Sequence, residues 1–340
     1  MTTERPRIED ATAPLWVGFG PRGWGDVVRD VRNDRPATAG EVIRTAGLDW
    51  RVEQYPVEAV IPPAPGGDEP CRVGVPRMLA NVRSDTGAVL GVVGDGYRPL
   101  QNRDAFALAD ALVDSGEAHW IGAGSTRGGA RVHALMRLDR EITIGGATGE
   151  DLLPLLLVRN GHDGGLAVTV SVAPFRLACL NGMIVPIEGA ARTWKARHTR
   201  RIDEKLADAR RSLAIAWRYY DALEDLGAQL LAAPLGPAAF DRFLHDLIPD
   251  PPIETDRERR RQRNAAQIRE EIHDLYRWTP DLENVRGTAW GALQAVTAYH
   301  DHHARTRRTG RSSTEARFER ATAPAPLKDR ALALLTEAAR

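Results

Sequence analysis

The stretch LLLVRNGHDGGLAVTVSVAPFRLACLNGM, residues 155–183, decides how the chain folds. Two apolar runs flank the polar, glycine-studded segment RNGHDGG, and this pattern predicts two strands joined by a hairpin turn. Asn and Asp tolerate left-handed backbone conformations and glycine adopts them freely, so turn chemistry explains every residue of the segment except His162. The apolar piece FRLACLNGM, residues 175–183, predicts a short helix that packs on the sheet.

Periodicity on either side of this stretch indicates more strands first and helices afterwards. The expected elements are a strand after Trp50, a hairpin over 71–100 with RSDTG as its turn, a helix over 103–116 capped by Asn102, and two hairpins between 118 and 160. From about residue 201 the apolar spacing is helical. The order predicts an α+β fold, a largely antiparallel β-sheet domain with packed helices followed by a helical C-terminal region.

We expect four parts along the chain. They are a loosely ordered N-terminal arm (1–48), an α+β sheet domain (49–200), a helical region packed on the sheet (201–312) and a C-terminal helical tail (313–340). Inside the first part, Thr38 and Glu41 have the spacing of a capping box, so a short helix begins there and ends at Gly47.

The composition is that of a soluble globular protein, with 43% hydrophobic and 27% charged residues. The N-terminus is too polar for a signal peptide and no apolar run is long enough to cross a membrane, so we expect a cytoplasmic protein without membrane contact. Cys71 and Cys179 lack the spacing of a zinc site or disulfide framework, and we expect both to be buried and reduced. No metal or cofactor is expected.

Charge is distributed unevenly along the chain, although the formal net charge is zero. Residues 1–190 hold 19 arginines, no lysine and 24 acidic residues, a balance of −5, and the remainder holds 27 basic and 22 acidic residues, a balance of +5. Basic runs lie at 192–201, 257–263 and 304–311. Such runs bind phosphate backbones or form solvated helix surface.

The turn itself offers two functional readings besides turn chemistry. Arg159, Asn160 and His162 are candidates to contact phosphates or base edges of a nucleic acid. His162 and Asp163, together with His198, are candidate general acid and base groups of an enzyme. The glycine-rich pieces elsewhere lack the spacing of nucleotide-binding loops and are typical of turns.

The segment RTWKARHTRR, residues 192–201, interleaves an aromatic side chain with cations. An aromatic ring there can stack on a base while its neighbours hold phosphates, but an edge strand that leads into a solvated helix explains the pattern equally well. The candidate nucleic-acid-binding residues of this segment are Arg192, Trp194, Lys195, Arg197, His198, Arg200 and Arg201.

Several motifs in order along the chain resemble the phage/plasmid-like protein family, domain of unknown function 932. The resemblance runs from about residue 50 to 310 and leaves out the first 45 residues and the tail. The matching positions are Tyr97, Pro99, Gln101 and Asn102; Asn160, His162, Asp163 and Gly164; Arg176, Cys179 and Asn181; Arg197, His198 and Thr199; and Gly287, Thr288, Ala295 and Tyr299.

The family has no established activity, but its association with phages and plasmids implies DNA transactions. We therefore expect a DNA-binding protein, with single-stranded DNA and further copies of itself as partners, acting as a single-strand annealing or replication and recombination accessory factor. A nucleic-acid- or nucleotide-processing enzyme with a His/Asp site is the first alternative, and a phage or plasmid protein that binds host proteins is another. We also predict that the His162 turn and the Arg197–His198 segment converge on one side of the sheet.

Overall fold

The computed structural model describes residues 24–25, 27–63, 69–145, 150–176, 181–188, 190–199, 214–252, 255–305 and 312–339. The fold is α+β, as the sequence predicts, and its centre is an antiparallel sheet of order β1-β5-β6-β8-β9-β10 with β7 on β8. Its strands are β1 (Arg29–Asp30), β5 (Ala118–Thr126), β6 (Arg131–Leu138), β7 (Ile142–Ile144), β8 (Glu150–Gly161), β9 (Val168–Arg176) and β10 (Thr193–Ala196).

Both faces of this sheet are covered. Leu156 and Val158 of β8 point into the larger core, whereas Leu155 and Leu157 join a second cluster with Phe318. A strand that is buried on both sides needs apolar residues at consecutive positions. This explains why residues 152–158 read as an almost unbroken apolar run.

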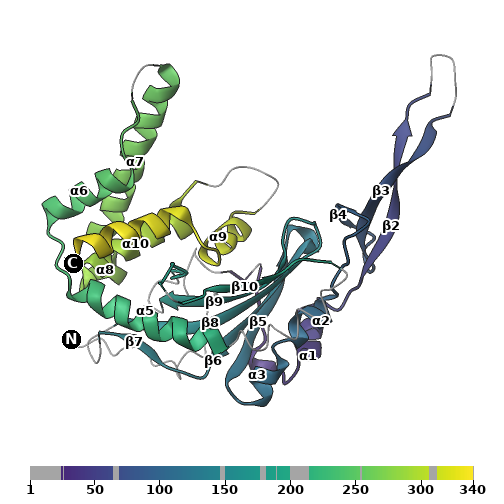
Figure 1. Ribbon diagram of the computed structural model, residues 1–340, viewed down its shortest axis with the longest axis horizontal. Coiled ribbons are helices and arrows are strands. Elements are labelled where there is room, and N and C mark those ends of the chain that lie inside the picture. The colour runs from purple at the N-terminus through teal and green to yellow at the C-terminus, as the bar shows by residue number, and fades with distance from the viewer. Residues whose placement is uncertain are drawn as a thin grey trace.

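A second sheet forms an arm that stands away from the body (Figure 1). It consists of β2 (Val52–Ile61), β3 (Cys71–Arg83) and β4 (Val89–Gly94), and the predicted RSDTG turn joins the last two strands. No described residue between Glu53 and Ala80 is buried. Cys71 lies on this arm and is exposed, so the prediction that it is a core residue is wrong.

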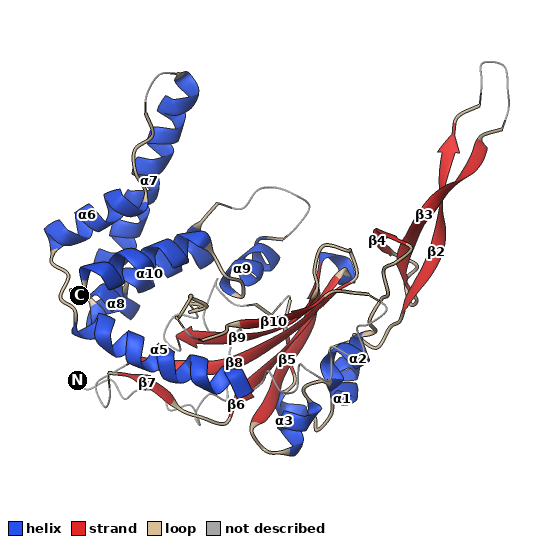
Figure 2. Ribbon diagram, viewed as in Figure 1, coloured by secondary structure: helices blue, strands red, loops and turns tan. Residues whose placement is uncertain are grey.

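Helices cover the sheet and extend beyond it (Figure 2). Near the base of the arm lie α1 (Ala39–Thr45) and α2 (Asn102–Ala107), and α3 (Asp110–Asp114) packs on β5. The C-terminal helices are α5 (Ala214–Ala232), α6 (Pro237–Leu247), α7 (Asp256–Trp278), α8 (Ala289–Ala298) followed by the π-helical turn η7 (Tyr299–His303), α9 (Ser313–Ala321) and α10 (Pro326–Ala338). The N-terminal half of α7 projects from the body at the side opposite the arm (Figure 1).

The start of the chain is more ordered than the sequence suggests. The capping box of Thr38 and Glu41 is present and Gly47 has a positive φ of 67°, as predicted. However, β1 pairs with β5, and Val42 is completely buried. A loosely ordered arm therefore does not describe residues 27–48, because their apolar side chains belong to the core.

Two local predictions are wrong. Phe175 and Arg176 are the last residues of β9, and Gly182 forms a bridge back to Phe175, so the described parts of 175–183 are extended rather than helical. Residues 177–180, including Cys179, lie outside the described residues. Gln101 is the N-cap of α2, whereas Asn102 is the first helical residue and turns its side chain into the core.

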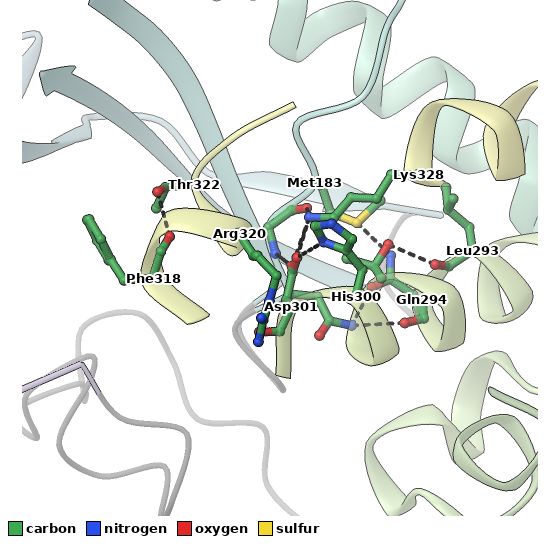
Figure 3. A network of polar contacts seen from close by, with 12 residues as sticks. Met183, Leu293, Gln294, His300, Asp301, Phe318, Arg320, Thr322 and Lys328 are labelled. Carbon is green, nitrogen blue, oxygen red and sulfur yellow. Dashed lines mark hydrogen bonds and ion pairs between the residues drawn. The ribbon is translucent and has the colours of Figure 1, made fainter. Parts of the chain in front are cut away.

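A buried ion pair ties α10 to the sheet domain (Figure 3). Lys328 Nζ lies 2.6 Å from Asp301 Oδ1 and donates to the Gly182 carbonyl oxygen at 2.8 Å. Asp301 Oδ2 accepts from the Gly182 amide at 3.0 Å, and its other oxygen contacts His300 Nδ1 at 2.9 Å. Lys328 and Asp301 are fully buried, so each charge relies on the other and on these hydrogen bonds.

Within the described part of the chain, no helix has the length and apolar character needed to cross a membrane.

Candidate nucleic-acid interface

His162 is a completely buried residue of the β8–β9 turn. Its Nε2 lies 2.8 Å from Asn102 Oδ1, and because Asn102 Nδ2 donates to the Leu48 carbonyl oxygen, the imidazole must donate in this contact. The backbone of His162 is hydrogen-bonded as well. Its amide donates to the Ala130 carbonyl oxygen, and its carbonyl oxygen accepts from Asn81 Nδ2. The turn is therefore held by segments far away in the sequence.

The neighbours of His162 also have structural partners. Asn160 is fully buried and donates through Nδ2 to the Leu100 carbonyl oxygen at 2.8 Å. Asp163 Oδ2 accepts from Arg131 Nε at 3.1 Å, and its Oδ1 accepts from the Gly165 amide at 2.8 Å. Gly164 supplies the positive φ, 72°, that the turn requires.

Arg159 points toward the C-terminal helices rather than toward solvent. Its Nη2 donates to the carbonyl oxygen and to the hydroxyl of Thr322, just after α9. Burial, opposed by Glu319, lowers the pKa of this guanidinium to about 10. A cavity of about 30 Å³ beside Arg159 and Arg131 holds roughly one or two water molecules. No nucleotide fits there.

The predicted convergence of the turn with the Arg197–His198 segment is confirmed. Tyr97 joins them, because its ring stacks on His198 with centroids 4.8 Å apart and its hydroxyl donates to the Gly161 carbonyl oxygen at 2.6 Å. The His198 carbonyl oxygen also accepts from the Arg98 amide. His198 is 7% exposed, so at this convergence its ring is packed within the protein.

The burial of His162 does not fit the hypothesis that it acts as a general acid or base. Burial and the neighbouring His198 lower the pKa of His162 to about 3, so the ring is neutral at pH 7. Burial also lowers the pKa of His198. A general base must reach a proton on its substrate, and His162 has no exposed surface with which to do so. No group of three or more potential metal ligands occurs among the described residues either.

The β10 segment divides into a buried and an exposed side. Trp194 is half-buried and packs on the core, and Arg192 pairs with Asp329 of α10 at 3.1 Å. Lys195 and Arg197 are exposed. Arg200 and Arg201 lie outside the described residues.

The clearest cluster of available cations lies on α7 instead. Residues 256–263 hold five arginines and two acidic residues, a net charge of +3, at the start of a 23-residue helix. Four of these side chains are exposed and have no ion pair within the described part of the chain, and we call them the arginine arm: Arg257, Arg260, Arg261 and Arg263. The basic run is visible in the sequence, but only the structure shows that it projects into solvent (Figure 1).

Comparison with known proteins gives one match. No curated protein and no solved structure matches the chain. A family model described as a domain of unknown function, DUF932, matches residues 89–322, which include the His162 turn and α7. Since the match covers well over half of the 340 residues, the chain belongs to the family of this domain of unknown function.

Proposed function

We propose that the protein binds DNA through the arginine arm of α7. The observation that carries the proposal is four exposed arginines, without ion pairs to any described residue, on a helix that projects from the body. Arginine guanidinium groups bind phosphate oxygens, and binding releases the counterions of the nucleic acid. The lower half of α7 carries Glu270, Glu271 and Asp274, so the phosphate contacts belong to the upper half.

Single strands are the preferred form in this proposal. Trp278 is 67% exposed at the end of α7, with the Arg277 guanidinium 4.8 Å from its ring centroid. It lies 18 residues after Arg260, about five helical turns, and therefore on the same side of the helix. An exposed indole stacks on an unpaired base, whereas the bases of a duplex are already stacked on each other.

The wider role in the proposal is that of a cytoplasmic single-strand annealing or replication and recombination accessory factor of a phage or plasmid. It follows from the family resemblance together with the cationic arm.

A second candidate function, self-association, is favoured by the β2–β3 arm. Tyr55, Val60, Ile61 and Val73 are 45–57% exposed on it. Exposed strands with apolar side chains favour contacts between chains. In this proposal the arm of one copy contacts a second copy, which gives a homo-oligomer.

Fluorescence anisotropy with a labelled single-stranded oligonucleotide across a salt series tests DNA binding. The variant Arg257→Gln/Arg260→Gln is compared with Arg29→Gln/Arg218→Gln, a control that removes two exposed arginines elsewhere. Each lost phosphate contact on a single strand should reduce the salt slope by about 0.7, so the α7 variant should lose roughly 1.4 units and the control none. Equal slopes in both variants, or no binding at low salt, would refute the proposal.

A further inference from the structure

A cavity of about 370 Å³ lies at the base of the β2–β3 arm. Its walls come from the start of α1, the segment before β2 and the start of α2, so three separate pieces of chain meet there. Trp50 forms one wall, and its ring is held in place by Arg83 on one side, 4.6 Å from the centroid, and by the edge-on ring of His162. The cavity is thus part of the packed structure around the His162 turn.

The charges around this cavity are mostly positive. Arg44, Arg51 and Arg103 line it, are exposed, and have no ion pair among the described residues. Asp49 is the acid that lines the same cavity, so the lining carries a net charge of +2. The Arg103 guanidinium reaches from α2 to α1 and lies against Gly40. A Cβ atom built on Gly40 would lie 3.5 Å from Arg103 Nη2, which is ordinary van der Waals contact.

Most other polar groups of the lining are already used by the protein. Thr38 caps α1, Gln101 exchanges two hydrogen bonds with the backbone of Val52, and Asn102 bridges Leu48 and His162. Among the described residues, the side-chain groups of the lining without a hydrogen-bond partner are the three guanidinium groups and the Trp50 indole N–H, which only donate, and the carboxylate of Asp49, which only accepts. A complementary ligand has anionic acceptors at one end and hydroxyl or amino donors at the other.

We propose that this cavity binds a phosphomonoester that also carries hydroxyl or amino groups, of the size of a nucleoside monophosphate. Arginine forks match phosphate oxygens, and Asp49 accepts from a sugar hydroxyl or a base amino group. The volume lies at the lower end of the roughly 300–1,000 Å³ that small-molecule sites occupy. The ligand is either a free nucleotide or the 5′-phosphate end of a DNA strand, since both present the same chemistry. The site does not depend on DNA binding by α7.

Isothermal titration calorimetry with the full chain tests the site. Nucleoside monophosphates should bind, and the matching nucleosides without phosphate should bind at least roughly tenfold more weakly. Arg44→Gln/Arg103→Gln should cause a similar loss, and Asp49→Asn should weaken the binding of nucleotides without weakening that of inorganic phosphate. These side chains are exposed, so the melting temperature of each variant should stay close to that of the wild type.

Arg257→Gln/Arg260→Gln provides the matched control, because it removes two arginines without touching the cavity. It should bind nucleoside monophosphates like the wild type. The same variant is then titrated with an oligonucleotide that carries either a 5′-phosphate or a 5′-hydroxyl group. Tighter binding of the 5′-phosphate form assigns the site to strand ends, and equal affinities of the two forms assign it to free nucleotides. No heat of binding with any nucleoside monophosphate, or undiminished binding by Arg44→Gln/Arg103→Gln, overturns the proposal. Failure of α7 to bind DNA leaves these outcomes unaffected.

Discussion

His162 shows how a buried histidine is accommodated in the turn between two central strands of a sheet. The ring donates through Nε2 to Asn102 and packs edge to face on Trp50 with centroids 5.6 Å apart. His133 has a comparable position, with Nε2 2.8 Å from the Val27 carbonyl oxygen and its ring beside Phe318. In both cases the partner atom accepts, so the neutral ring supplies the proton of the hydrogen bond.

These two histidines make the fold sensitive to acid. Burial lowers the pKa of His162 and of His133 to about 3, and electrostatic repulsion of the protonated ring by His198 and by Arg159, respectively, adds to this shift. Below pH 6.5 these two histidines bind protons in the unfolded chain, whereas in the folded chain they do so only near pH 3. The free energy of unfolding should therefore fall as the pH drops from 6.5 toward 3, by up to about 1.4 kcal/mol per pH unit for each histidine.

Urea denaturation between pH 7.5 and 4 measures this slope. His162→Gln keeps an amide donor for Asn102 but does not titrate. The free energy of unfolding of this variant should therefore fall less steeply with decreasing pH, by the contribution of one histidine. An identical pH dependence in the variant and the wild type would show that His162 does not contribute.

At the scale of elements, α10 is attached to the body by the Lys328–Asp301 pair. Burial lowers the pKa of Lys328, and Asp301 opposes this shift. Burial also acts to raise the pKa of Asp301, but Lys328 and His300 outweigh it and the pKa is lowered. Each residue thus favours the charged form of the other in a completely buried site.

Lys328→Met should lower the free energy of unfolding by about 3–5 kcal/mol, because it leaves the carboxylate of Asp301 buried without its counter-charge. The double variant Lys328→Met/Asp301→Asn should recover much of this loss, since it removes both charges and keeps an acceptor for the Gly182 amide. Chemical denaturation of the two variants beside the wild type provides the comparison. A double variant that is less stable than Lys328→Met would contradict this account.

For the molecule as a whole, the body and the β2–β3 arm contribute differently to stability. The core clusters include residues from Trp24 to Leu335, whereas the described residues from Glu53 to Ala80 contribute no buried side chain. Deleting residues 58–74 joins Val57 to Val75 and leaves a five-residue loop between the paired residues Pro56 and Leu79.

This deletion should change the melting temperature by less than about 3 °C, because almost no apolar surface is withdrawn from the core. If the arm holds copies together, the solution mass from light scattering should fall from a multiple of 37.3 kDa to that of a single chain. A large loss of melting temperature would assign the arm to the core, and an unchanged oligomer mass would assign self-association to another surface.

The sequence by itself determined most of the elements and the fold class. Strands with apolar runs, the RSDTG and RNGHDGG turns and the capping box at Thr38 follow from interactions within a few residues, and these the sequence displays directly. The order of strands and helices then predicts the α+β class. The predicted helix at 175–183 failed because Arg176 pairs with Glu150 and Asn181 donates to Gln294, both distant in sequence.

Only the tertiary structure decided what the polar residues of the candidate site do. Arg159, Asn160 and His162 have the composition of a binding turn, but each is buried or half-buried and donates a hydrogen bond to a partner 60 to 163 residues away in the chain. The arginine arm of α7 is equally visible as a basic run, yet its exposure depends on where the helix leaves the body (Figure 1). Sequence patterns predict the local backbone conformation because this conformation depends on residues that are close in the sequence. Burial and charge pairing depend on contacts across the whole fold, so they appear only once the chain is folded.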